Sequence, residues 1–546
     1  MGFRPLQTRL FSPLAPPVDN GDGTVSDEWF VLKVEGREGL SRLYEVEVTF
    51  QSVAALFEPC AEETLEQYLD TNWTLQLVQE VHANEEDGAF EDVSGAVAHA
   101  FHGVLREIEM LPINARPGSA VHVGYRAVLV PRLWYATRSV RTRIFQGMSA
   151  PEIIAHVLEE TGLQRDDDYE LRLREPHPMR EYTLQYNESD FAFLARLAEY
   201  EGIAFGFEQG EDRERVVFAD HNDAWQRFEA LEPFGMPHVR HDPVAKANHP
   251  SIRQLRRTVR KVARSVVALD HDARAPRVCP QDHTEAHERG AGVEQYWLHG
   301  KEYTHVDAAP AEDMTAQMMR LTTLRVQAIL AARERLEAVS TVLALFSGTR
   351  FGLENHFDDS LVWLHRGRGQ RREWLVVGAR FRVEQDFVSF GRPRDEARLD
   401  FEAVLEVQDA SLVFRPPLDT PRPVVAGVLP ARVHDLVKGP GADLDAAGQY
   451  LLMFDIPTIG APEYGGGTMR RFRMAQTFSG PGYGMHHPLH LGAEVLVAHL
   501  AGDPDRPIIV ASPPNGENTS PITQANPTHG GFKTRAGVTV YTNDDA

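Results

Sequence analysis

The chain has 546 residues, which at roughly 100–200 residues per domain predicts three or four domains. Apolar residues make up 42% and charged residues 25%, a composition typical of a folded globular protein, and the net charge of −23 disfavours partners such as nucleic acid or an anionic membrane. The only two cysteines, Cys60 and Cys279, are too few for a disulfide framework or a cysteine-rich zinc module.

The N-terminal segment and the hydropathy pattern predict neither export by a leader nor a membrane span. Residues 1–23 contain no apolar h-region, so we expect no signal peptide. No run of ~18 apolar residues occurs anywhere in the sequence. Any export of this protein would therefore use another route.

Most of the chain is predicted to form short strands. In the clearest example, residues 44–50, the apolar side chains of Tyr44, Val46, Val48 and Phe50 alternate with polar ones, which is typical of a half-buried strand. Similar runs occur at residues 73–77, 125–130, 373–381 and 401–407. Such a pattern favours antiparallel barrels or sandwiches.

Three helices are expected between these strands. Ser149 is a candidate N-cap with Glu152 as its capping-box partner, and Gly162 is a candidate stop. A second helix is predicted from Ser189-Asp190 to Gly202, and a third from about residue 311 to 339.

Two linkers divide the chain. Residues 414–423 hold four prolines, which remove backbone donors and favour an extended connector, so we place a domain boundary there. Residues 513–516, Pro-Pro-Asn-Gly, indicate a second boundary.

The sequence has no nucleophile elbow, no P-loop and no dinucleotide fingerprint in a βαβ setting. The glycine-rich segment 480–484 is interpreted as a turn, because no helix is predicted after it. Carboxylates are plentiful, but no acid/base pair stands out from an ordinary solvated surface.

Three histidine groups are weak candidates for a metal site. His283 and His287 would share a face if they lay on a helix, and Cys279 could add a third ligand, but the glutamate position does not fit a zincin, so a surface loop is the preferred interpretation. In the group 484–490, Pro488 disfavours a helix that would bring two histidines together. His356 lies beside two aspartates without a nucleophile. We therefore predict no catalytic residue, no metal and no cofactor.

Two basic clusters contrast with the acidic composition. The first is Arg253, Arg256, Arg257, Arg260, Lys261 and Arg264, which forms one exposed stripe whether the segment is a strand or a helix. The second spans residues 366–372 and is interpreted as a hairpin loop. Neither is interleaved with aromatic residues as a nucleic-acid groove would be. A docking surface for an acidic partner and salt bridges between subunits are both open interpretations.

Several motifs, in their order, resemble the VgrG family, the trimeric spike proteins of the bacterial type VI secretion system, which are similar to the hub and spike of a contractile phage tail. Each motif alone has modest specificity, but their order along most of the chain is a strong signal. The matching segments are residues 39–46, 101–104, 129–134, 144–154, 185–197, 201–203, 492–497 and 502–509. Within them, the motif residues to which we assign structural roles are Asn187, Glu188, Ser189, Asp190 and Phe191, and Gly502, Asp503, Pro504, Asp505, Arg506 and Pro507.

The resemblance implies a mainly β fold with α insertions. Residues 1–425 would form a phage-hub-like domain of β-barrel-like subdomains with helical insertions. Residues 426–515 would form an OB-type barrel, and residues 516–546 a neck and the start of a triple-stranded β-helix needle. In residues 503–507, a tight turn is expected in which Arg506 pairs with Asp503 or Asp505.

The resemblance also implies a function and partners. The protein would be a non-catalytic homotrimeric spike that docks on a ring-forming tube protein and on baseplate components, and carries a PAAR-type tip protein and effector cargo. It would assemble in the cytoplasm and be secreted by the contractile machine. An isolated strand such as residues 538–542 cannot satisfy its backbone donors or bury Val538 and Val540 unaided, which favours a trimer on physical grounds as well.

Three alternative functions stay open from the residues. The chain could be the hub-spike protein of a phage tail or of an extracellular contractile particle. It could be a metal-dependent hydrolase that uses Cys279, His283 and His287. It could also be a carbohydrate-binding module, because OB-type barrels can bind oligosaccharides.

Overall fold

In the computed structural model, the described residues form a mainly β protein with few helices. Besides five short strand segments in residues 2–26 and 81–82, the described ranges are 29–52, 63–69, 71–78, 97–111, 123–228, 239–242, 250–269, 281–297, 310–355, 372–385, 399–434, 442–460 and 471–544. Cys60, Cys279, His356 and the predicted loop at residues 366–371 lie outside the described residues. No described helix combines the length and the apolar character that a membrane crossing requires.

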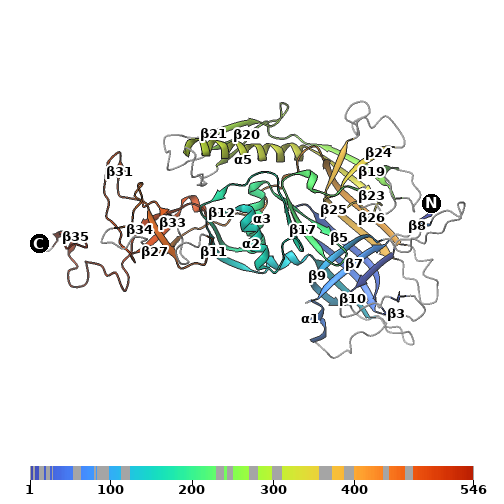
Figure 1. Ribbon diagram of the computed structural model, residues 1–546, viewed down its shortest axis with the longest axis horizontal. Coiled ribbons are helices and arrows are strands. Elements are labelled where there is room, and N and C mark those ends of the chain that lie inside the picture. Colours follow the sequence, from blue (N-terminus) through green and yellow to red (C-terminus); the bar gives the residue numbers. More distant parts are fainter. Residues whose placement is uncertain are drawn as a thin grey trace.

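A 12-stranded sheet forms the hub, at the right of Figure 1. Its first half has the order β2-β7-β9-β10-β6-β5. These strands are β2 (Gln7–Phe11), β7 (Asn72–Val78), β9 (Val97–Met110), β10 (Val123–Val130), β6 (Arg42–Ser52) and β5 (Trp29–Gly39), with the short helix α1 (Glu63–Leu69) beside them. The predicted alternation is confirmed, because all four apolar side chains between Tyr44 and Phe50 are buried.

The second half of the sheet closes into a ring of six strands. Its order is β25-β24-β18-β19-β23-β26, and β25 also pairs with β26. The strands are β25 (Glu373–Gln385), β24 (Arg350–Asn355), β18 (Val239–His241), β19 (Ile252–Val259), β23 (Glu334–Ser340) and β26 (Leu399–Asp409). Because β25 also pairs with β5, the two halves share one hydrophobic core that runs from Leu10 to Val407.

A helical insertion lies between the hub and the C-terminal end (Figure 1). Helix α2 (Ala150–Glu160) begins at the predicted capping box of Ser149 and Glu152, and α3 (Asp190–Glu201) ends at Gly202, whose φ of 72° is left-handed. The two helices pack on each other and on the sheet β13-β17-β16. The other elements here are η2 (Arg132–Thr137), β11 (Val140–Phe145), β12 (Met148–Ser149), β13 (Tyr169–Arg172), β14 (Met179–Arg180), β15 (Thr183–Ser189), β16 (Ala204–Gln209), β17 (Glu214–Ala219) and η3 (Asn222–Ala224).

The third helix is shorter than predicted. Helix α5 (Pro310–Arg333) ends at Arg333, and the next residue begins strand β23, so the prediction of a helix to residue 339 was wrong. The side chains of Leu336, Ala338 and Ser340 are buried in alternation, because β23 fills the place between β19 and β26. Helix α5 packs against a three-stranded sheet of β21 (Gln281–Glu285), β20 (Ser265–Leu269) and β22 (Val293–Trp297).

A five-stranded barrel follows the proline connector, at the left of Figure 1. Residues 411–427 contain neither helix nor strand, as predicted for an extended connector. The sheet order is β30-β28-β27-β33-β34, and it closes because the backbone N–H of Ala475, next to β30, donates to the carbonyl of Ile509 in β34 (2.8 Å). The strands are β27 (Val428–His434), β28 (Tyr450–Phe454), β30 (Arg471–Phe472), β33 (Glu494–His499) and β34 (Pro507–Ala511), with β29 (Thr458–Ile459) and η7 (Leu500–Gly502) at the edge.

Two hairpins extend this end of the molecule. Strands β31 (Ser479–Gly480) and β32 (Tyr483–Gly484) confirm the predicted turn at residues 480–484. Strands β35 (His529–Lys533) and β36 (Thr539–Asn543) pair near the C-terminus. Each apolar side chain of this second hairpin is exposed, including Val538 (59%) and Val540 (54%).

Candidate functional site

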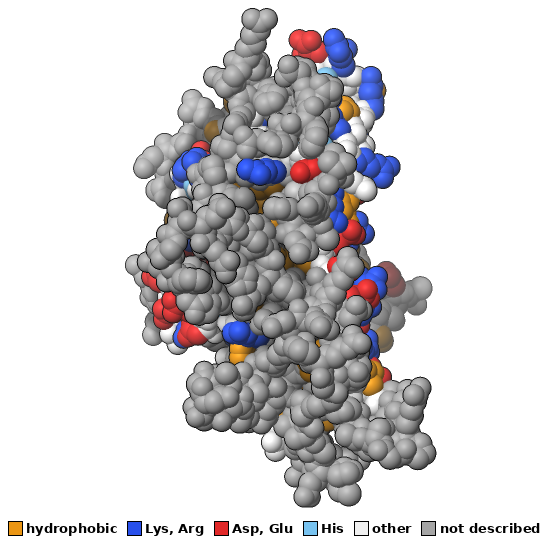
Figure 2. All heavy atoms as spheres, turned by 90° about the vertical axis from the view of Figure 1, so that its right-hand side faces the viewer, with side chains coloured by type: hydrophobic (Ala, Val, Ile, Leu, Met, Phe, Trp, Pro, Cys, Tyr) orange, Lys and Arg blue, Asp and Glu red, His pale blue; other side chains and the backbone are white. Residues whose placement is uncertain are grey.

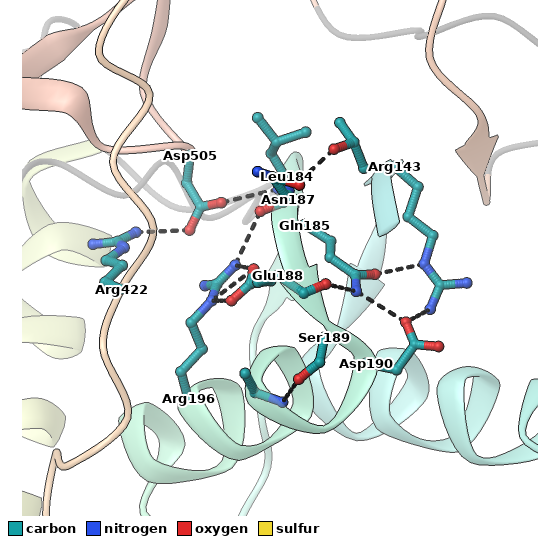
Figure 3. A network of polar contacts seen from close by, with 12 residues as sticks. Arg143, Leu184, Gln185, Asn187, Glu188, Ser189, Asp190, Arg196, Arg422 and Asp505 are labelled. Carbon is teal, nitrogen blue, oxygen red and sulfur yellow. Dashed lines mark hydrogen bonds and ion pairs between the residues drawn. The ribbon is translucent and has the colours of Figure 1, made fainter. Parts of the chain in front are cut away.

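Two sequence motifs that lie more than 300 residues apart meet at one place between the hub and the barrel (Figure 3). The backbone N–H of Leu184 in β15 donates a hydrogen bond to Oδ1 of Asp505, at the start of β34 (3.0 Å). Around this contact lies a set of polar side chains, all buried except the half-buried Arg422, which we call the joint. It consists of Arg143, Gln185, Glu188, Asp190, Arg196, Arg422, Asp503 and Asp505.

A strained turn at Asn187 positions the hub side of the joint. The strand pairing between β11 and β15 shifts at this point, and Asn187 has a φ of 46°, which asparagine tolerates better than most residues. Its backbone N–H donates to the Thr142 hydroxyl (3.0 Å). Ser189 then caps α3 by accepting from the N–H of Ala192 (3.1 Å). The turn thus directs the two acidic side chains of the motif, Glu188 and Asp190, into the interior.

Asp190 is fully buried, and it is surrounded by donors. Its carboxylate accepts from Arg143 (3.0 Å) and from the Gln185 amide (2.9 Å), and it forms an ion pair with Arg141 (3.2 Å). The Gln185 amide oxygen in turn accepts from Arg143 (2.6 Å). A buried carboxylate is stable only with such compensation, so these residues depend on one another.

Glu188 and Arg196 form a second buried pair. The guanidinium donates through two nitrogens to the carboxylate, with distances of 2.6–3.1 Å, and also donates to the carbonyl of Leu184 (3.0 Å). A bidentate Arg–carboxylate pair fixes direction as well as distance. The pair therefore locks helix α3 to the strand that contacts the barrel.

On the barrel side, the joint includes a residue of the proline connector. Arg422 forms ion pairs with Asp503 (2.5 Å) and Asp505 (2.8 Å). Burial acts to lower the pKa of Arg422, but the two aspartates outweigh it and raise the pKa, so the guanidinium stays charged. The backbone N–H of Arg506, which the sequence suggested as their partner, donates to the carbonyl of Asp503 (3.0 Å), and Arg422, some 80 residues earlier, pairs with both carboxylates. The backbone N–H of Asp505 also donates to Asp503 (3.0 Å), which holds the turn.

A second buried charge cluster anchors the connector to the hub. Glu201 pairs with Arg180 and Arg320 (2.6 Å each). Burial acts to raise the pKa of Glu201, but the two arginines hold it well below its ordinary value. Arg415 of the connector donates to the carbonyls of Gly202 (2.7 Å) and Asp220 (2.9 Å). The role of these residues was not predicted, although two arginines next to prolines in the connector, Arg415 and Arg422, were a signal that it is anchored.

Apolar contacts reinforce the joint. Ile144, Tyr182 and Leu184 of the insertion are buried in the hydrophobic core of the barrel. Strand β29 of the barrel pairs in parallel with β11, Ile144 opposite Thr458. Insertion, connector and barrel are therefore one continuous packed body in this structure.

The candidate metal residues do not gather into a site among the described residues. Residues 281–285 form a strand, so His283 and His287 do not share a helix face, and no group of three or more potential ligands gathers in the described part of the chain. In the second group, His486 interacts with Tyr450 (3.1 Å) and Gln476 (2.8 Å), whereas His490 lies 3.4 Å from Arg535. Their ring nitrogens thus point to different partners.

A cavity of about 60 Å³ lies in the hub, lined by Glu38, His99 and Trp225 among others. This volume has room for a few water molecules and is far below that of a ligand pocket. The joint offers no space for a ligand either, because its polar groups are packed against each other. Its chemistry is that of a structural lock.

Comparison with known proteins agrees with a spike architecture. The family model of the phage tail baseplate hub (GPD) matches residues 37–387. The type VI secretion system spike protein VgrG1a of Pseudomonas aeruginosa is 29% identical over 93% of this chain and 71% of its own length. VgrG1c of the same organism is 28% identical over 92% of this chain and 62% of its own length.

Solved structures show the same fold. The Escherichia coli c3393 protein, described as a type VI secretion component similar to the T4 tail proteins gp27 and gp5, aligns with a TM-score of 0.56 at 20% identity, over 93% of this chain and 99% of its own. A chain of the lidless PdpA–VgrG complex aligns with a TM-score of 0.60 at 8% identity, over 100% of this chain and 94% of its own. The chain thus belongs to the phage tail baseplate hub (GPD) family and is homologous to the VgrG spike proteins, which confirms the resemblance in its motifs.

Proposed function

We propose that this protein is the spike of a type VI secretion system, and that its work is mechanical. The observation that carries this proposal is the joint, in which hub insertion, proline connector and barrel are tied by buried ion pairs and one shared apolar core. A spike that transmits thrust from a tube to a tip must not bend between these parts. Buried charges that are paired with one another suit that task because they fix geometry.

The assembled form is proposed to be a homotrimer. The hairpin β35–β36 exposes Phe532, Val538, Val540 and Tyr541, and a two-stranded hairpin is marginal in water on its own. Three copies around an axis would cover these side chains and satisfy the strand edges. Such permanent interfaces bury more than ~2,000 Å².

We assign a separate function to each of the three regions proposed from the sequence. Residues 1–425 would form the hub that docks on the ring-forming tube protein and the baseplate, and residues 426–515 the OB-type barrel. Residues 516–546 would form the neck and the start of the needle, which carries a PAAR-type tip protein and effectors. The particle would assemble in the cytoplasm and then be expelled by sheath contraction, without a catalytic step in this chain.

One relative is named as a toxin, so the proposed absence of catalytic activity in this chain needs a test. The actin cross-linking toxin VgrG1 of Vibrio cholerae is 25% identical over 91% of this chain, which covers only 42% of that protein. The joint supplies no nucleophile and no open substrate pocket, so we propose that the described region is not an enzyme. A phage-tail hub remains the second candidate, because the matching family model is that of a phage baseplate hub.

A secretion assay in the native host tests the proposal. The tagged protein should appear in the culture medium of wild-type cells, and should stay inside cells that carry a sheath protein unable to contract. Equal release from both strains would contradict a contraction-driven spike. Copurification with a DNA-filled particle would instead support the phage-tail candidate.

A further inference from the structure

Strand β19 and the residues after it carry an exposed row of positive charge. Five basic side chains, which we call the basic strip, are all exposed: Arg256, Arg257, Arg260, Lys261 and Arg264. The segment 252–264 contains no acidic residue, in a chain with a net charge of −23. The structure decides the alternative left open by the sequence, because residues 252–259 form a strand.

The fold neutralises this strip only in part. Arg257 has a close partner in Glu334 (2.7 Å), but Arg256 lies 3.9 Å from Glu337, and Arg264 lies 3.6 Å from Glu285. Arg260 and Lys261 form no ion pair with any described residue. Exposed pairs at such distances hold their partners weakly, so most of the strip is free to meet another molecule.

The second basic cluster of the sequence ends at the same place. Arg372, its last residue, lies 3.5 Å from the Glu334 carboxylate that also pairs with Arg257. Segments that lie more than 100 residues apart in the sequence thus bring their positive charge together at one acidic side chain. Figure 2 shows Lys and Arg side chains along the right-hand margin of the hub end, where acidic side chains are interspersed.

The strip has no structural task that would explain it. Arg143 and Arg196 of the joint are buried and paired with carboxylates, whereas the side chain of Arg256 is 80% exposed. The C-terminal half of β19 also runs past the core, since residues 256–259 are all exposed. Apart from the pair of Arg257 with Glu334, the strip makes no close ion pair with a described residue, and a concentrated like charge costs stability.

We infer that the basic strip is a docking surface for a partner protein with an acidic face, bound to the side of the hub. Charge complementarity favours this class of partner: the strip offers four guanidinium groups and one ammonium group, and guanidinium groups pair with carboxylates in two-point contacts. Nucleic acid fits less well, because no aromatic side chain is interleaved with the arginines and the rest of the chain repels a long polyanion. The inference does not rest on the proposed spike function.

A binding experiment with a defined probe tests this inference. The purified full chain is titrated against a fluorescein-labelled polyglutamate peptide, and anisotropy is followed at rising sodium chloride. The variant R256Q/R260Q/K261Q should bind about tenfold more weakly and with a smaller salt dependence. The matched control R37Q/R227Q/R432Q removes three other exposed charges, with side-chain exposures of 71%, 62% and 55%, and should bind like the wild type.

Three results would overturn the inference. Equal loss of binding in both triple variants would show that only net charge matters. Tighter binding of duplex DNA than of polyglutamate, lost in the strip variant, would identify a nucleic-acid surface. A change in sedimentation from oligomer to monomer in the strip variant alone would identify a contact between copies of this chain. As a control, circular dichroism should give the wild-type spectrum for both variants, which would show that they are folded.

Discussion

Single residues of the joint carry its stability because their charges are buried. Asp505 accepts the Leu184 N–H and pairs with Arg422, so one carboxylate connects hub, connector and barrel. Such a group is costly to bury and more costly to remove, since its partners are then left uncompensated.

Replacement of Asp505 by alanine should open the joint. The variant D505A leaves the Leu184 N–H without its acceptor and Arg422 with one aspartate, a local cost of about 3 kcal/mol. Thermolysin cleavage within residues 414–425 should then be roughly hundredfold faster, because proteolysis follows the population of the open form. The control D455A removes an exposed carboxylate, 66% accessible, that pairs with Arg432. Equal cleavage rates for both variants would show that Asp505 does not hold the connector.

His499 should make the barrel sensitive to acid. Burial lowers the pKa of His499 to about 4, although Asp505 and Asp503 act in the opposite direction. Because the folded pKa lies below the unfolded value of about 6.5, its stabilising contribution is present above pH 6.5 and is lost as the pH falls toward 4. The loss amounts to at most about 2 kcal/mol at pH 5. Thermal unfolding between pH 7 and pH 5 should therefore show a smaller decrease in Tm for H499Q than for the wild type; identical decreases would exclude this residue as the cause.

Among the elements, those with local signals could be predicted from the sequence. The alternation at residues 44–50, the capping box of α2 and the glycine stop of α3 are all encoded within a few residues, and each is confirmed. The end of α5 could not be predicted, because Glu334, Arg335 and Leu336 favour a helix and only the neighbours β19 and β26 make them a strand. The motif aspartates were found, but their partner Arg422 was not, since pairing over such a sequence distance depends on the tertiary fold.

The strained turn at Asn187, in strand β15, can be tested by substitution. A β-branched residue is strongly disfavoured at a φ of 46°, whereas glycine adopts it freely. We expect N187V to lose about 2 kcal/mol of stability and N187G to stay within about 0.5 kcal/mol of the wild type. Urea unfolding followed by tryptophan fluorescence measures both. A stable N187V together with a destabilised N187G would show that the asparagine side chain, and not the backbone conformation, matters.

On the scale of the whole molecule, the barrel is packed on the hub, and the C-terminal hairpin is exposed. The joint accounts for the first feature, and the second is the basis of the proposed trimer. Together with the family assignment, these two features favour a mechanical function for the protein.

Charges on the hairpin should prevent assembly. Val538 and Val540 lie on the same face of the terminal segment, and V538D/V540D would place two carboxylates per chain in the proposed trimer contact. Light scattering should then give the 61.2 kDa mass of a single chain, against three times that mass for the wild type. The variant T539D, on the opposite face, should stay trimeric. A wild-type protein that is itself monomeric would count against the trimer.

Electron cryomicroscopy of the purified particle tests the proposed mechanical spike. We expect a threefold particle that tapers from the hub to the barrels, with each barrel in one fixed orientation and resolved density at Arg422 and Asp505. Single-chain particles, or barrels that take several orientations relative to the hub, would contradict it.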